Sequence, residues 1–221
     1  MYKNKIIFYL IWLILFSLAP ITIFLNTPLS AIILSPASMA NTAQRLFGLW
    51  AFTLMFVQVI LGSFMTKWTE KFGGWIFKFH VLEGIFLYLL ILVHGFTFVF
   101  FRYFTKHGLD PFYVFVDVCV LCGKSFEFYY NFGRVGFWLV TIAVLTGLFR
   151  TATPFLRVHW RKFHVLNYAA FLLIGIHSFF LGGDISEFPF KFIYIPSLII
   201  VMGILIFKGW NLYQTSRGKG K

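Results

Sequence analysis

Four of the six histidines lie inside long apolar stretches of the sequence, His80 and His94 in one stretch and His164 and His177 in another. An ionisable side chain at membrane depth is costly, so it usually has a function. The alternative is a neutral histidine hydrogen-bonded to a neighbouring helix, which explains a single residue more easily than two pairs. The pattern therefore predicts two pairs of ligand histidines.

The spacing within each pair indicates what the histidines bind. His80 and His94 are 14 residues apart, about 21 Å along a helix, and His164 and His177 are 13 residues apart, about 19–20 Å. If the two stretches run in the same direction, His80 is level with His164, and His94 is level with His177. Two facing imidazoles at one depth are the axial ligands of a six-coordinate haem iron. We therefore expect two stacked b-type haems, an arrangement that favours electron transfer over oxygen storage.

The helical phase fits one stretch better than the other. Fourteen residues return a side chain to within about 40° of its starting face, whereas 13 residues leave it about 140° away. The helix with His164 and His177 must therefore bulge or rotate, or approach its haems from different sides. Gly175, two residues before His177, is a place where such a distortion is easy.

The elements that position these histidines are membrane-spanning helices. The 221 residues are 60% hydrophobic and only 12% charged, which excludes an ordinary soluble domain. A run of more than about 18 apolar residues predicts a helix that crosses the bilayer. The first run exceeds the roughly 7–15 apolar residues of a cleaved signal peptide, so we expect it to remain as a helix. The sequence predicts a single all-α domain over 1–221, with six transmembrane helices at about 5–25, 44–65, 79–101, 134–150, 163–181 and 192–209.

The net charge of +12 predicts the orientation of these helices. With the N-terminus inside, thirteen of the 19 Lys and Arg residues, including Lys219 and Lys221, fall on the inner side. This positive-inside pattern predicts that both termini are cytoplasmic and that the protein lies in the plasma membrane. The basic charge is then explained by topology and by anionic lipids, and binding of nucleic acid is not expected.

Three charged residues are candidates for supporting roles. Arg45 and Arg134 begin the second and fourth predicted helices on the outer side, where they are placed to bind the anionic propionates of a haem. The alternative for both is snorkelling at a helix end. Glu83, one turn after His80, is placed either to accept a hydrogen bond from an axial histidine or to face water of the inner leaflet.

The longest predicted outer connection, at about 102–133, holds both cysteines of the chain, Cys119 and Cys122. An oxidising outer compartment permits a disulfide there, which would allow a relay of electrons to a thiol partner. The apolar neighbours of the pair favour the alternative, a structural role in which reduced cysteines are packed in an interfacial segment. His107 and His159 have no partner at the same depth, so neither is expected to be a haem ligand.

One segment resembles a known family: Trp160-Arg161-Lys162-Phe163-His164-Val165-Leu166-Asn167-Tyr168. With the histidine spacings, it is similar to the ferric reductase-like transmembrane domain over nearly all six predicted helices. That superfamily includes metalloreductases, NADPH oxidases and the haem-bearing membrane subunit of a periplasmic methionine sulfoxide reductase, a short form whose third helix lacks a counterpart of His80. The resemblance implies two b-type haems that carry electrons from the cytoplasmic side to the outside.

The sequence contains no glycine-rich fingerprint for a dinucleotide. The resemblance therefore implies that FAD or FMN and NAD(P)H act only through a separate cytoplasmic flavoprotein. The outer acceptor is left open among ferric iron, oxygen and a protein. Two further functions also stay open: a quinone-linked cytochrome b that anchors a respiratory complex, and a transporter that uses the same histidines without haem.

Overall fold

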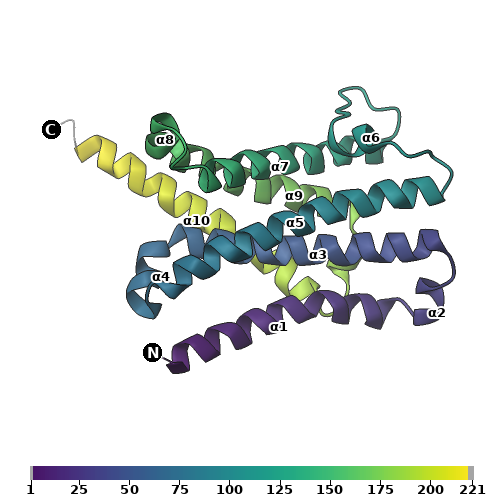
Figure 1. The fold of residues 1–221 in the computed structure, drawn as a ribbon, viewed down its shortest axis with the longest axis horizontal. Coiled ribbons are helices and arrows are strands. Elements are labelled where there is room, and N and C mark those ends of the chain that lie inside the picture. Colours follow the sequence, from purple (N-terminus) through teal and green to yellow (C-terminus); the bar gives the residue numbers. More distant parts are fainter. Residues whose placement is uncertain (1, 219–221) are drawn as a thin grey trace.

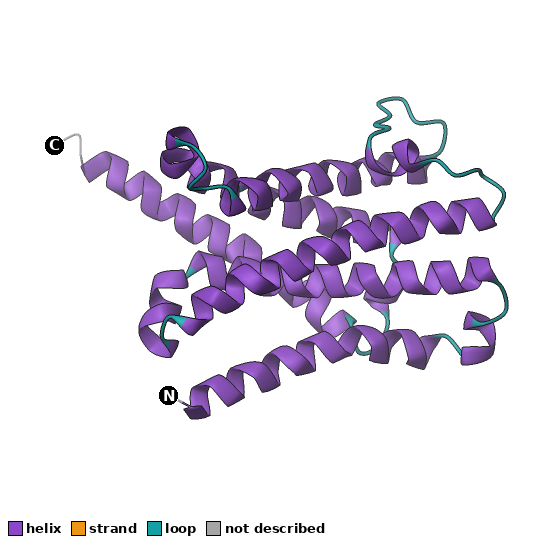
Figure 2. Cartoon of the chain, in the orientation of Figure 1, coloured by secondary structure: helices purple, strands orange, loops and turns teal. Residues whose placement is uncertain are grey.

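The computed structural model describes residues 2–218, and throughout that range its regular structure is helical (Figure 2). The helices are α1 (Tyr2–Asn26), α2 (Leu29–Ile32), α3 (Pro36–Ser63), α4 (Met65–Phe72), α5 (Trp75–Phe104), α6 (Pro111–Phe115), α7 (Ser125–Leu148), α8 (Pro154–His164), α9 (Leu166–Leu181), the 3-10 helix η1 (Gly183–Ser186) and α10 (Lys191–Gly218). Lys219 and Lys221, which the charge pattern places on the inner side, lie outside the described residues.

Six helical stretches are long and apolar enough to cross a membrane, which confirms the predicted number. Five of them are α1, α3, α5, α7 and α10, and the sixth is formed by α8 and α9 together. Many large apolar side chains on these helices face outward, as Ile14, Leu82 and Phe207 do. A bundle with such a surface is a multi-pass membrane protein, because lipid is the environment that these side chains favour.

Three of the spans begin eight or nine residues earlier than predicted: α3, α7 and the span formed by α8 and α9, which begins at Pro154 rather than at 163. Local capping explains the start of α3. α3 begins at Pro36 rather than near 44, because the hydroxyl of Ser35 accepts a hydrogen bond from the amide of Ser38 and Pro36 occupies the first turn. α7 begins at Ser125 rather than at 134. Both helices therefore extend into segments predicted to be loops.

The fifth span contains an interruption, which was one of the alternatives that the helical phase of its histidines left open. α8 ends at His164 and α9 begins at Leu166, and the amide of Tyr168 donates to the carbonyl of Val165 at 3.1 Å. A bond between residues three apart marks a tighter turn than that of an α-helix. The irregularity therefore lies directly after His164 and not at Gly175, where α9 is continuous.

The helices form two packed pairs that face each other, α3 with α5 and α7 with α9 (Figure 1). α1 packs on α3, and α10 packs on α3 and α9. α1 begins and α10 ends at the same end of the bundle as α4 and α8, which we call the terminal end (Figure 1). α2, α6 and the connection from α6 to α7 lie at the opposite end, which we call the loop end (Figure 1). That the terminal end is cytoplasmic stays a prediction from the charge pattern.

Candidate cofactor site

Two of the four candidate histidines meet near the terminal end. His80 lies on α5 and His164 is the last residue of α8, and the centroids of their rings are 6.1 Å apart with the ring planes at 76°. Two imidazoles on opposite sides of one metal ion, at metal–nitrogen distances of about 2 Å, have centroids roughly 6 Å apart. The structure therefore brings this pair to the separation that a shared metal ion requires.

The other two histidines, His94 of α5 and His177 of α9, line one cavity of about 760 Å³ toward the loop end. Sites for cofactors and other small molecules have volumes of about 300–1,000 Å³ and mostly apolar walls. The apolar lining comes from both helix pairs and includes Phe52, Ile91, Phe98, Phe137 and Ile174. The polar lining includes Asn41, Arg45, Arg134, Asp184 and Glu187.

Three of the four rings are oriented by a backbone carbonyl of the neighbouring helix. The Nδ1–carbonyl pairs are His94 with Gln44 at 2.8 Å, His164 with Ala143 at 3.2 Å and His177 with Tyr129 at 3.2 Å. A carbonyl only accepts hydrogen bonds, so Nδ1 carries the proton and Nε2 presents its lone pair. Ligand histidines in metalloproteins are held in this way.

Each ring also lies against a glycine of the neighbouring helix. The pairs are His94 with Gly48 and His80 with Gly62 on α3, and His177 with Gly133 and His164 with Gly147 on α7. The glycines are 14 residues apart within each helix, and the three carbonyl acceptors stand four residues before their glycines. Our reading of the sequence missed these glycines, although their spacing, equal to that of His80 and His94, was a usable signal.

His80 differs from the other three because its Nδ1 is buried without a hydrogen-bond partner. The side chain of Gln58 donates instead to the backbone carbonyl of His80 at 3.0 Å and to Glu83. The other carboxyl oxygen of Glu83 accepts from Nε1 of Trp12 at 3.0 Å. Glu83 is only 4% exposed, so it neither faces water nor accepts from a candidate ligand, and both predicted roles are wrong.

Arg45 lines the loop-end cavity, where its main partner is a carboxylate. Its Nε donates to Asp184 of η1 at 2.7 Å, Nη2 donates to the second oxygen of Asp184, and Nη2 also lies 3.2 Å from the hydroxyl of Thr27. The two residues are 139 positions apart in the sequence. Arg45 is therefore held at the cavity wall rather than extended along a helix end.

Arg134 also lines this cavity and is only 4% exposed. Its Nε donates to the carbonyl of Tyr113 at 3.0 Å, and Nη1 donates to the side chain of Asn131 at 3.0 Å. Because α7 begins at Ser125, Arg134 lies well inside the helix. The prediction that it starts the helix, and with it the snorkelling alternative, is wrong.

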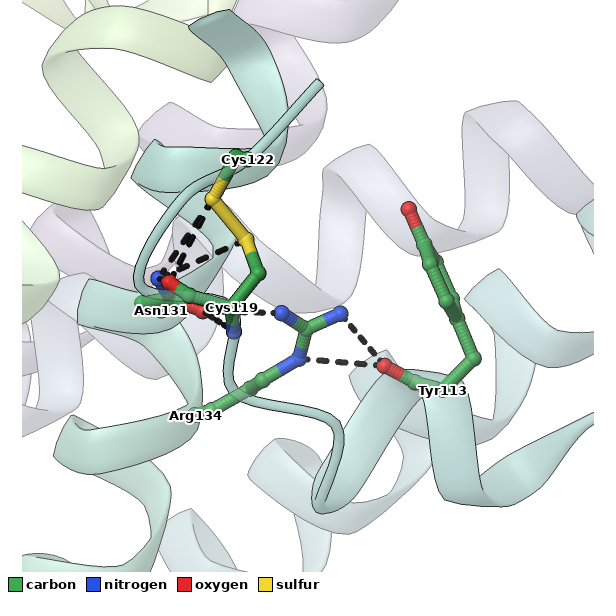
Figure 3. The surroundings of a disulfide bond; sticks show 5 residues. All are labelled: Tyr113, Cys119, Cys122, Asn131 and Arg134. Atoms are coloured by element: carbon green, nitrogen blue, oxygen red, sulfur yellow. Dashed lines mark hydrogen bonds between the residues drawn. A yellow bond between two sulfur atoms is a disulfide. The ribbon is translucent and has the colours of Figure 1, made fainter. Parts of the chain in front are cut away.

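Cys119 and Cys122 form a disulfide in the connection between α6 and α7, with their Cα atoms 5.3 Å apart (Figure 3). The alternative of packed, reduced cysteines is therefore wrong. Neither His107 nor His159 joins the candidate sites: Nδ1 of His107 lies 3.1 Å from the hydroxyl of Thr105, and Nδ1 of His159 lies 3.0 Å from the carbonyl of Phe155.

Comparison with family models, with curated proteins and with solved structures gives no match for this chain. The resemblance to the ferric reductase-like domain therefore stays a prediction that rests on the histidine spacing and on the segment around His164.

Proposed function

We propose that the chain carries electrons across the membrane through two b-type haems, one held by His80 and His164 and the other by His94 and His177. The observation that carries this proposal is the repeated arrangement of the histidines, in which each ring lies on a glycine and three rings donate Nδ1–H to a carbonyl. These bonds leave Nε2 of His94, His164 and His177 free to bind a metal ion.

The number of ligands supports haem over a bare metal ion. Among residues 2–218, no three His, Cys, Asp or Glu side chains gather into a possible metal site. A pair of histidines therefore needs further ligands from elsewhere, and the porphyrin of a haem supplies four nitrogens around the iron. When bound, the group would supply a reversible one-electron change at its iron.

The residues around the loop-end pair fit such a group. The apolar walls of the cavity suit the flat face of a porphyrin, and Arg45 and Arg134 provide positive charge for its propionates. Arg45 is already paired with Asp184, so Arg134, whose partners are a carbonyl and an amide, is the stronger candidate for a propionate.

The direction of transfer follows from the charge pattern. If the basic terminal end is cytoplasmic, a separate flavoprotein with FAD or FMN delivers electrons near His80 and His164. They then leave near His94 and His177 for an outer acceptor, with ferric iron, oxygen and a protein as the candidates. In this scheme the chain is the plasma-membrane subunit of a larger oxidoreductase.

The test is the absorption spectrum and haem content of the purified protein. We expect a Soret band, an α-band on reduction, and two haems per chain. His94→Ala removes one ligand of the loop-end pair and is expected to retain about one haem per chain. His159→Ala is the matched control, because His159 is bonded to its own helix, and it is expected to retain two. A purified protein without haem, or an unchanged haem content in His94→Ala, would overturn the assignment.

A second function, a quinone-linked cytochrome b, is favoured by one observation. A cavity of about 390 Å³ lies between α1, α3 and α4 and is lined mainly by apolar side chains, among them Phe8, Trp12, Phe56 and Trp68. Trp12 of this cavity donates to Glu83, three residues after His80. Reduction of the haems by a short-chain quinol, abolished by Trp12→Ala, would favour this donor over a flavoprotein.

A further inference from the structure

The Cys119–Cys122 disulfide contributes little to holding the fold together. Both cysteines belong to the connection between α6 and α7, so the bond joins no two helices. A disulfide stabilises a fold mainly by closing a loop of the unfolded chain, and the effect is smallest for short loops. A bond across three positions is therefore better explained by its chemistry than by stability.

The turn that carries the disulfide presents an apolar tip to its surroundings. Val120 is 85% exposed and Leu121 is 96% exposed, and both lie between the two cysteines. The cysteines themselves are half-buried beneath this tip. An exposed apolar group directly beside a disulfide suits contact with a partner protein that must bring its own sulfur close.

The base of the same turn is tied to the wall of the loop-end cavity. The side chain of Asn131 accepts from the amide of Cys119 at 3.2 Å, donates to the carbonyl of Cys119, and lies 3.7 and 3.9 Å from the two sulfur atoms. Asn131 also accepts from Arg134 (Figure 3). Arg134 in turn lines the cavity with His94 and His177. Two residues on successive turns of α7 thus connect the disulfide to the candidate haem site.

The guanidinium of Arg134 is linked to the sulfurs through Asn131, which donates toward both of them. It is buried beside Asn131, and positive charge near a cysteine favours the thiolate, the form that attacks a disulfide.

We propose that Cys119 and Cys122 form a thiol–disulfide exchange site, which makes the acceptor of this chain a disulfide-bonded protein on the outer side. The inference rests on the proposed function, since the ferrous haem of that pathway is the reductant. Two electrons, delivered one at a time, and two protons from water convert the disulfide into two thiols.

The exchange with the partner protein then needs no further oxidant or reductant. One thiolate of the pair attacks a sulfur of the partner's disulfide, and the released partner sulfur takes up a proton. The second cysteine attacks the resulting mixed disulfide, which restores the Cys119–Cys122 bond and leaves the partner with two thiols. The pair thus returns to its oxidised form after each transfer.

The first experiment tests the sulfur chemistry without haem turnover. The purified protein is equilibrated with buffers of reduced and oxidised glutathione, and its thiols are counted by the mass added by a maleimide reagent. We expect the labelled fraction to rise gradually to two thiols per chain across the series. With oxidised glutathione, Cys119→Ser and Cys122→Ser should each gain one glutathione. A wild-type bond that stays oxidised in every buffer would overturn the proposal.

The second experiment connects the pair to the haems and separates the two proposals. The haem-loaded protein is titrated anaerobically with reductant, and haem absorbance and thiol labelling are read from the same samples. We expect wild type to take up two more electrons per chain than the Cys119→Ser/Cys122→Ser double variant, whose haem content should be unchanged.

The His94→Ala variant shows whether the electrons reach the disulfide through the loop-end site. If they do, fewer of its thiols should be labelled than in wild type at the same amount of added reductant. Haems that become reduced while the disulfide stays oxidised overturn the exchange site and leave the proposed function standing. A protein without haem overturns the proposed function, and with it the electron source assigned to this disulfide.

Discussion

The two pairs consist of the same residue type but lie in different surroundings. At the loop end, His94 and His177 lie on uninterrupted helices, both donate to carbonyls, and both line a cavity. At the terminal end, His164 is the last residue before an irregular turn, and Nδ1 of its partner His80 has no acceptor. The loop-end histidines are therefore the more firmly oriented pair, which would favour the affinity of the proposed haem there.

The glycines show the same contrast in the closeness of packing. A Cβ added at Gly133 or Gly48 would lie 2.7 or 2.9 Å from the facing histidine ring, closer than atoms can pack. A Cβ added at Gly147 or Gly62 would lie 3.6 or 3.5 Å away, which is ordinary contact. The rings are thus pressed against the backbone at the loop end and are looser at the terminal end.

The largest expected effect comes from alanine at the tight glycines. Gly133→Ala pushes the ring of His177 away from α7 and breaks its bond to the carbonyl of Tyr129. Loss of such supporting contacts costs about 10–100-fold in the affinity of a metal site. We expect the purified variant to retain about one haem per chain, counted from its reduced absorption spectrum.

Gly147→Ala is the matched control on the same helix, because its added methyl group only touches the ring of His164. It is expected to retain both haems. Equal losses of haem in Gly133→Ala and Gly147→Ala would contradict the distinction between a tightly packed and a loosely packed histidine pair.

A smaller effect is expected from the charge beside the terminal-end pair. Both oxygens of Glu83 accept hydrogen bonds from N–H donors, and at a pH high enough to ionise it this carboxylate places a negative charge beside the terminal-end pair. A nearby negative charge stabilises ferric iron over ferrous iron, so Glu83→Gln should raise the midpoint potential of the haem near His80. At an effective dielectric constant near 20, the change is on the order of 1–2 kcal/mol, or tens of millivolts.

A potentiometric titration followed at the α-band measures this shift. The midpoint potential assigned to the loop-end haem should move much less, because His94 and His177 lie about three to four helical turns beyond Glu83 and the terminal-end pair. The contrasting control is Glu70→Gln on α4, which removes a negative charge without touching the hydrogen bonds of Gln58 or Trp12. Two midpoints that move equally in Glu83→Gln would contradict the assignment of Glu83 to one level.

The sequence was sufficient for the spans and for the pairing of the histidines by level. The apolar runs predicted all six crossings, since length and hydropathy decide them. The 13-residue spacing also indicated either an irregular fifth helix or an approach to the haems from different sides, but it did not place an irregular turn at Val165. That position depends on how α8 packs against α7, which periodicity alone does not describe.

Contacts between residues far apart in the sequence could not be predicted from it. The partner of Arg45 is Asp184, and nothing near either residue indicates the other across 139 positions. Glu83 accepts a hydrogen bond from Trp12 of a different helix, so both roles predicted for it, at a ligand histidine or toward water, were wrong. By contrast, the glycines of α3 and α7 were predictable in principle, because helices that pack closely on a ring require the smallest residue at the same spacing.

The smallest effect is expected midway between the two pairs. Tyr88 lies eight residues after His80 and six before His94, and its ring stacks on Phe137 at 6.5 Å between centroids. Its hydroxyl forms a 3.1 Å hydrogen bond with that of Thr141, which joins α5 to α7. Tyr88→Phe removes this bond and is expected to lower stability by about 0.5–1.5 kcal/mol, measured by thermal unfolding in detergent.

Thr141→Val removes the same hydrogen bond from the other helix, together with the bond from the Thr141 hydroxyl to the carbonyl of Phe137, and should cost at least as much. The double variant should cost less than the sum of the two, because the bond between Tyr88 and Thr141 is lost only once. Since Tyr88 lies between the two levels, both haems should be retained, and any change in their midpoints should be small and similar. A shift confined to one haem would show that Tyr88 belongs to that site, and the boundary between the tight and the loose half of the bundle would then lie elsewhere on α5.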